Sequence, residues 1–146
     1  MIVADTSVFT DFLIIFDEDR HRKARLFLTE ASRRGIVFYE PFLFDVELAG
    51  VLCRRYSREV VYKILREVRN RVELLDEALI HEAALDVAVK THCRAIDAYF
   101  IATTKETGST LISNDKLMVS NARKYGIEAY YLIEESKKAM ELLKKL

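Results

Sequence analysis

The chain has 146 residues, of which 51% are hydrophobic and 32% charged, and its 23 basic residues balance its 23 acidic residues. This length is sufficient for one domain with a buried core, and the charge balance excludes a strongly basic nucleic-acid-binding tail. The longest apolar run, Phe12–Phe16, is far too short to span a membrane, and no secretory signal precedes it. We therefore expect a single cytoplasmic domain covering residues 1–146.

Amphipathic helical stretches alternate with short β-rich runs along the chain. In chain order, we expect a strand at Ile2–Ala4, a helix at His21–Arg34, a strand at Ile36–Tyr39, a helix from Pro41 to about Tyr56, a helix capped by Ser57 that carries Val60–Val68, a strand at Val72–Leu75, helices at Glu77–Thr91 and Ile96–Thr107, a strand at Thr110–Ser113, a helix at Asp115–Tyr125, a strand at Ile127–Leu132 and a helix at Glu134–Leu146. Pro41 is expected in the first turn of its helix, where proline is tolerated.

Three glycines have the same sequence context. Gly35, Gly108 and Gly126 each follow a helical stretch and precede a β-rich run within two residues. Glycine tolerates the left-handed conformation that commonly ends a helix. A repeated helix–glycine–strand pattern predicts an α/β fold with a largely parallel sheet.

Two aspartates stand where predicted strands end. Asp5 follows Ile2–Ala4, and Asp115 follows Thr110–Ser113 by two residues. Ligands of parallel α/β sheets bind at the carboxyl ends of the strands, so both aspartates are candidate site residues. The alternative is that each merely caps a helix, which is a common role for aspartate.

Glu47 lies among apolar residues on its predicted helix. Its neighbours three and four positions away are Leu43, Phe44, Gly50 and Val51. An unpaired carboxylate on such a face is costly, so Glu47 requires a cation, a partner or access to solvent. An ion pair with an arginine is the alternative. Gly50 costs about 1 kcal/mol relative to alanine in a helix, which we interpret as room for something to approach closely.

Asp97 repeats this pattern near the start of another helix. Its neighbours Cys93, Arg94, Phe100 and Ile101 place it at the edge of an apolar face. A favourable interaction with the helix dipole is the alternative explanation. Glu47 and Asp97 together are harder to explain in this way than either acid alone.

Four carboxylates that converge on one spot would repel one another unless cations lie between them. The candidates are Asp5, Glu47, Asp97 and Asp115. Hard oxygen ligands of high negative charge suit Mg²⁺ or Mn²⁺, and such ions promote hydrolysis of phosphodiesters. The acids thus predict a metal, and the metal predicts phosphate chemistry.

Other chemistries have little support in the sequence. Ser7 lacks the context of a catalytic nucleophile, and no glycine-rich phosphate loop is present. Arg94, Lys105 and Lys116 lie near the acids in sequence and could bind phosphates, although solvent-exposed helix faces often carry such residues.

The sequence resembles a PIN domain and, within that family, the VapC-type toxins of prokaryotic toxin–antitoxin pairs. The matching segments are Val3–Ser7, Glu47–Leu48, Asp97–Ala102 and Leu111–Asp115. Their order and spacing agree with the family over essentially the whole chain. No single segment is specific, but the ordered set is.

The resemblance implies a three-layer α/β/α fold with a small, mainly parallel sheet and Mg²⁺- or Mn²⁺-dependent hydrolysis of RNA by an endoribonuclease. It implies that the four acids ligate metal directly or through water, and that Ser7 and Asn114 line the site as supporting polar residues. It also implies a homodimer and a cognate antitoxin. The stretch Phe12–Ala24 departs from the family as an apparent insertion whose acids add negative charge near the entrance.

Three alternatives stay open. The chain could be a catalytically silent PIN-like module that binds RNA or protein, or a nuclease that processes RNA outside any toxin–antitoxin pair. A haloacid-dehalogenase-like phosphatase also begins with a strand ending in aspartate. That chemistry needs a second aspartate two residues later, where this chain has Ser7.

Overall fold

The strands of the computed structural model, which describes residues 1–146, form one sheet in the order β3-β2-β1-β4-β5. They are β1 (Ile2–Ala4), β2 (Phe38–Pro41), β3 (Val72–Leu75), β4 (Thr110–Ser113) and β5 (Ala129–Tyr131). All four neighbouring pairs are parallel, as the helix–glycine–strand pattern predicts. The bounds of β1, β3 and β4 match the predicted ones, whereas β2 begins later and β5 is shorter than expected.

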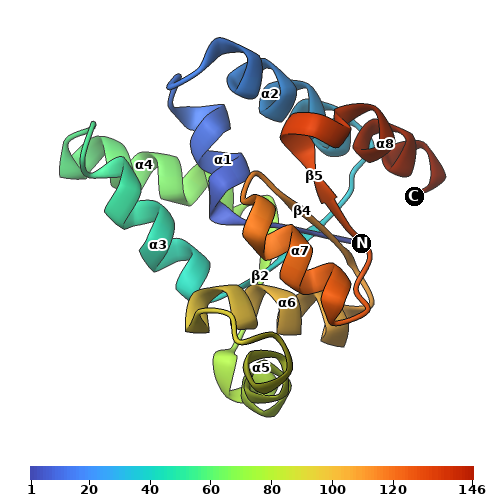
Figure 1. Ribbon diagram of the computed structural model, residues 1–146. Coiled ribbons are helices and arrows are strands. Elements are labelled where there is room, and N and C mark those ends of the chain that lie inside the picture. Colours follow the sequence, from blue (N-terminus) through green and yellow to red (C-terminus); the bar gives the residue numbers. More distant parts are fainter.

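Eight helices connect and follow the strands. They are α1 (Thr6–Leu13), α2 (Glu18–Arg33), α3 (Leu43–Leu52), α4 (Arg58–Arg69), α5 (Glu77–Thr91), α6 (Ala95–Thr107), α7 (Lys116–Lys124) and α8 (Leu132–Lys145). Helix α2 packs between α1 and α8 on one side of the sheet, while α6 and α7 cover the strands from the other side and α5 packs on α6 (Figure 1). Helices α3 and α4 extend beside α1. This is the predicted three-layer α/β/α arrangement.

The centre of the sheet is buried on both faces. All residues of β1 and β4 are buried, and β1 is entirely apolar, as expected for parallel strands covered by helices. A cluster of 34 buried apolar residues surrounds them. Phe9 of α1 joins this core, with its ring 4.9 Å from that of Phe44 and 5.9 Å from that of Phe38.

Helix α1 was not expected from the sequence, because its β-branched and polar residues have weak helical propensity. Asp5 caps it, accepting a hydrogen bond from the backbone of Ser7. The stretch Phe12–Ala24 contains the end of one helix and the start of the next. Its first residues end α1, and α2 begins at Glu18, behind an N-terminal cap formed by Asp17.

Pro41 was also misplaced by the sequence. It ends β2, opposite Leu75, and does not begin a helix. A proline lacks a donor for the ladder and is tolerated at such a strand end. Helix α3 begins at Leu43 and ends at Leu52, and Tyr56 lies in the following turn, where its hydroxyl donates to the carbonyl of Leu13 at 3.1 Å.

The three glycines close their helices as predicted. Gly35, Gly108 and Gly126 have φ angles of 68°, 61° and 90°, a conformation that costs glycine little. His92 closes α5 in the same conformation, with φ of 59°.

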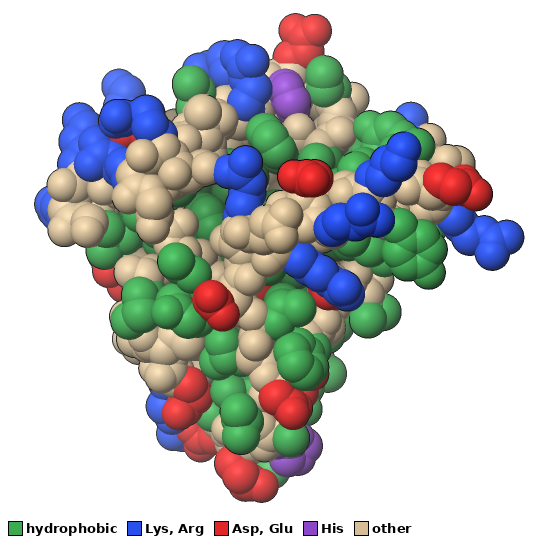
Figure 2. Space-filling model, turned by 180° about the vertical axis from the view of Figure 1, so that it is seen from behind, with side chains coloured by type: hydrophobic (Ala, Val, Ile, Leu, Met, Phe, Trp, Pro, Cys, Tyr) green, Lys and Arg blue, Asp and Glu red, His purple; other side chains and the backbone are tan.

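The surface carries charges of both signs. Figure 2 shows basic, acidic and apolar side chains interspersed over the face turned away from the viewer of Figure 1. This agrees with the balanced formal charge of the chain. No helix combines the length and the apolar character needed to cross a membrane.

Candidate active site

The four predicted acids come from four elements that meet at the carboxyl edge of the sheet. Asp5 lies between β1 and α1, and Asp115 caps α7 directly beyond β4. Because β1 and β4 are parallel neighbours, these two loops leave the sheet side by side. Asp97 lies in the first turn of α6, and Glu47 lies in the middle of α3.

Asp5 is the most deeply constrained of these acids. Its side chain accepts hydrogen bonds from the Ser7 backbone at 3.0 Å, from the Ser7 hydroxyl, and from the Ser113 hydroxyl at 2.7 Å. Burial raises the pKa of Asp5 to about 7, although the two serine hydroxyls lower it. The neighbouring charges of Glu47 and Asp115 raise the pKa of Asp5 further.

Asp115 both caps a helix and faces the other acids. Its Oδ1 accepts from the backbone N–H groups of Leu117 and Met118 at 2.9 and 3.2 Å. Its Oδ2 contacts Arg94 at 3.3 Å. The capping role predicted as the alternative is therefore real, but it occupies only one carboxylate oxygen.

Glu47 is held by a hydroxyl and forms no ion pair. The Thr6 side chain donates to Oε2 of Glu47 at 2.5 Å, while Oε1 accepts no hydrogen bond. The alternative of an arginine partner for Glu47 is therefore wrong. No part of the chain itself approaches Gly50, which is exposed and has no atom within 4 Å of the position that a Cβ would take.

Asp97 is 1% exposed, and its only side-chain partner is Arg94. Nε and Nη2 of Arg94 lie 3.2 and 3.1 Å from the two oxygens of Asp97. Hydrogen bonding to Asp97 raises the pKa of Arg94, with smaller contributions from Asp115 and Glu47. Arg94 thus lies among three of the four acids.

The other two basic residues proposed to bind phosphates do not contact the acids. The ammonium of Lys105 donates to the Tyr125 hydroxyl at 3.0 Å. That of Lys116 lies 3.3 Å from Glu134. Of the basic residues predicted near the acids, only Arg94 reaches them.

The supporting residues Ser7 and Asn114 are bonded to each other and to an acid that the sequence analysis missed. The Ser7 hydroxyl accepts from the Asn114 backbone at 2.9 Å, and the Asn114 amide donates to Asp11 at 2.6 Å. Asp11 is buried and also pairs with Arg20 at 2.9 Å. This network fixes the loop that carries Asp115 against the start of α1.

Glu40 is a second buried acid that the sequence analysis missed. Strands β1 and β2 pair only at Ile2 and Phe38, and Oε1 of Glu40 accepts the N–H of Ala4 at 2.9 Å where the strands separate. Its Oε2 is buried without a partner. Burial raises the pKa of Glu40 well above its ordinary value, and Asp5 adds to this effect. The one available signal was a glutamate inside an otherwise apolar run.

The donors at this edge suit a hard divalent cation. Asp5, Glu47, Asp97 and Asp115 offer only carboxylate oxygens, and Oε1 of Glu47 has no partner in the protein. As the side chains stand, no three of the acids surround a point as ligands of one ion would. In this structure the guanidinium of Arg94 supplies the positive charge beside Asp97 and Asp115. Because all four side chains offer carboxylate oxygens, the donor atoms themselves fit Mg²⁺ or Mn²⁺.

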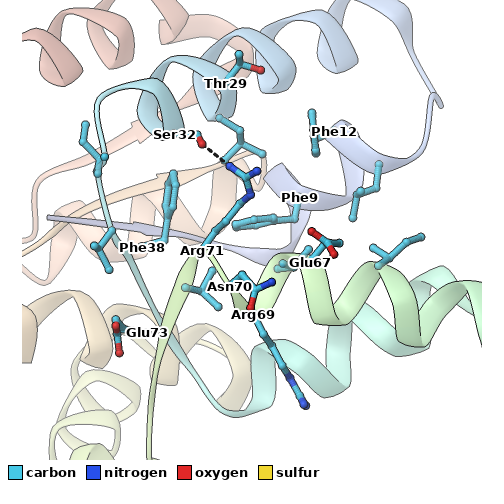
Figure 3. Close-up of a pocket in the computed structure, with 18 of the residues that line it drawn as sticks. Phe9, Phe12, Thr29, Ser32, Phe38, Glu67, Arg69, Asn70, Arg71 and Glu73 are labelled. Atoms are coloured by element: carbon cyan, nitrogen blue, oxygen red, sulfur yellow. Dashed lines mark hydrogen bonds between the residues drawn. The ribbon is translucent and has the colours of Figure 1, made fainter.

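A separate groove of about 1170 Å³ lies between α1, α2, α4 and the β2–β3 side of the sheet, and none of the four acids lines it. Figure 3 shows the rings of Phe9, Phe12 and Phe38 around it and a hydrogen bond between Arg71 and Ser32. Basic side chains outnumber acidic ones in its lining. They are Arg33, Lys63, Arg69 and Arg71, against Glu67 and Glu73.

Comparison with known proteins agrees with this fold. A profile of the PIN domain matches residues 2–124. The crystal structure of PAE2754 from Pyrobaculum aerophilum has the same fold, with a TM-score of 0.64 and 14% sequence identity over 94% of this chain and 89% of that chain. No protein with a curated description matches the sequence.

The chain belongs to the PIN domain family, whose profile covers most of it. PIN domains are generally nucleases that use divalent metals, so the family gives the acids at the carboxyl edge a chemical context. The family also removes the phosphatase alternative.

Proposed function

We propose that this protein is a Mg²⁺- or Mn²⁺-dependent endoribonuclease in which residues 1–146 form a single catalytic domain. The observation that carries the proposal is the placement of Asp5, which is buried beside Glu47 and Asp115 with a pKa of about 7. A buried acid in this environment is expensive for the fold, and perturbed acids of this kind concentrate at functional sites. Membership of a nuclease family supplies the reaction class.

In this mechanism the chain orients oxygens and controls protons. Ser7 and Ser113 orient the Asp5 carboxylate, and Thr6 fixes one oxygen of Glu47. Asp5 must lose its proton to act as a ligand, so ligation competes with protonation near neutral pH. A bound divalent cation would supply activation of water and stabilise the charge that develops on the phosphodiester.

Incubation of the purified protein with structured RNA tests this proposal. We expect cleavage with Mg²⁺ or Mn²⁺ and none with EDTA. The acids alone provide no Lewis acid that could activate water or stabilise negative charge on the phosphate. Gel analysis of end-labelled RNA would reveal internal cuts. Cleavage that persists in EDTA would contradict the metal mechanism, and an absence of cleavage for every RNA would favour a catalytically silent binding module.

We further propose that the nuclease is the VapC-type toxin of a toxin–antitoxin pair and acts as a homodimer. The groove in Figure 3 supports a protein partner, because its apolar floor suits the apolar face of an amphipathic segment. Such a segment would be supplied by the antitoxin. The groove lies apart from the acids, so this partner could bind without using the metal ligands.

Induced expression in a bacterial host separates a toxin from a housekeeping nuclease. We expect the wild-type chain to arrest growth and the Asp5→Asn variant, expressed to the same level, to leave growth unchanged. Arrest requires cleavage of an essential RNA, so both outcomes follow from one activity. Cleavage of RNA in vitro without growth arrest would favour the nuclease that processes RNA outside a toxin–antitoxin pair.

A further inference from the structure

Arg94 occupies the middle of the acid cluster, although it comes from the same chain as the acids. Its guanidinium donates hydrogen bonds to both oxygens of Asp97 and to one oxygen of Asp115. The negative charge of Glu47 also raises the pKa of Arg94. These acids lie on α6, at the start of α7 and on α3, respectively. A single side chain therefore balances carboxylates from three elements.

The contacts of Arg94 with the carboxylates can be broken and replaced by those of another cation. Their lengths of 3.1 to 3.3 Å exceed the 2.7–2.9 Å typical of strong bonds between guanidinium and carboxylate. The Arg94 side chain is 71% exposed, whereas that of Asp97 is 1% exposed. The arginine can therefore rotate into solvent without disturbing the core, but the Asp97 carboxylate cannot leave.

Asp97 explains why some cation is needed at this position. It is buried, and Arg94 is its only side-chain partner. Removal of a partner from a buried carboxylate leaves an uncompensated charge, which is strongly unfavourable. When Arg94 moves away, another cation must therefore take its place.

We propose that Arg94 is an internal counterion that holds the acid site together in the metal-free protein and is displaced when a divalent cation binds. This inference rests on the proposed metal-dependent function. It makes the contacts of Arg94 and the metal mutually exclusive at Asp97 and Asp115, so that Arg94 weakens the apparent affinity for the metal. The arginine thereby sets the metal concentration at which the site fills.

Titration of Mn²⁺ into protein freed of metal with a chelator tests this competition without any RNA. The variants are Arg94→Ala, Arg94→Lys and Arg54→Ala, and isothermal calorimetry measures the affinity. Arg54 is an exposed arginine in the turn after α3 with no ion pair, so its loss changes the charge of the chain equally. Thermal unfolding in EDTA shows whether each variant is folded.

We expect Arg94→Ala to bind Mn²⁺ at least about fivefold more tightly than the wild type, because Arg94 is exposed to solvent whereas its partner Asp97 is buried. Arg94→Lys and Arg54→Ala should stay within about twofold of the wild type, because the first keeps the competing charge and the second never had one. In EDTA, Arg94→Ala should unfold at a lower temperature.

Two results would overturn the inference, and they differ in what else they affect. If the wild type binds Mn²⁺ and Arg94→Ala binds it equally or more weakly, Arg94 is no competitor, while the nuclease proposal stands. If neither protein binds Mn²⁺ at millimolar concentration, the metal-dependent function itself fails and the inference fails with it.

Discussion

We expect Asp5→Asn to lose RNA cleavage and at the same time to stabilise the metal-free protein at pH 8. These are the largest effects on activity and stability that we expect from one substitution. Cleavage should fall by more than about 100-fold, because loss of even an outer partner of a metal site typically costs 10–100-fold. Asparagine keeps the cap of α1, since its amide oxygen can accept the Ser7 N–H. The fold should therefore survive while the ligand is lost.

The gain in stability follows from the direction of the pKa shift. The pKa of Asp5 is raised from 3.8 to about 7, so the folded protein retains a proton that the unfolded chain releases. Stability from this group is fully present below pH 4 and declines as the pH rises to about 7. A shift of about three units corresponds to about 4 kcal/mol, and we expect Asp5→Asn to recover roughly half of it, since the new amide must find its own partner.

Urea unfolding in EDTA between pH 4 and pH 8 measures this effect. The difference in unfolding free energy between Asp5→Asn and the wild type should grow up to about pH 7 and then become constant. Ser109→Ala, a substitution away from the acids, is a suitable control and should retain the pH dependence of the wild type. A variant that cleaves RNA normally would contradict the role of Asp5 as a ligand.

Glu40 should show opposite responses to two substitutions. Glu40→Ala removes the acceptor of the buried Ala4 N–H and leaves a cavity, so at pH 5 we expect a loss of about 3 kcal/mol in unfolding free energy. Glu40→Gln keeps an oxygen for that N–H and cannot ionise. It should therefore be more stable than the wild type at pH 8.

The sign again follows from burial. The raised pKa of Glu40 means that the folded state favours its protonated form, and stability from this group declines as the pH rises above its ordinary value of 4.5. Urea unfolding at pH 5 and pH 8 for both variants checks this. The assignment fails if Glu40→Ala is as stable as the wild type at pH 5, or if Glu40→Gln shows the pH dependence of the wild type.

Local sequence signals placed the parts of the site that depend on chain order. The strand-end logic located Asp5 and Asp115 correctly because parallel strands bring their carboxyl ends to one edge. The same logic could not exclude helix capping, and the structure contains both roles. For Asp97 the apolar helical neighbourhood predicted burial, which is confirmed. Whether these residues ligate a metal stays a proposal.

Long-range partners could not be predicted in this way. Glu47 was expected to need a cation, a partner or access to solvent, and its hydrogen-bond partner is Thr6, which lies 41 residues away in the sequence on a helix that had no clear helical pattern. For Arg94 the sequence allowed phosphate binding or a place on a solvent-exposed helix face, and it contacts the acids themselves. Such pairings depend on how α1, α3, α6 and α7 pack together, which no local pattern encodes.

The sequence by itself determined the alternation of strands and helices, the parallel sheet and the candidate acids, because apolar periodicity, helix-ending glycines and strand-end aspartates are local properties. Only the tertiary structure decided that Arg94 lies among those acids, that Asp11 and Glu40 are buried beside them, and that Asp5 has a pKa of about 7. Burial and charge proximity depend on residues far apart in the chain. They arise only when the sheet and both helix layers have come together.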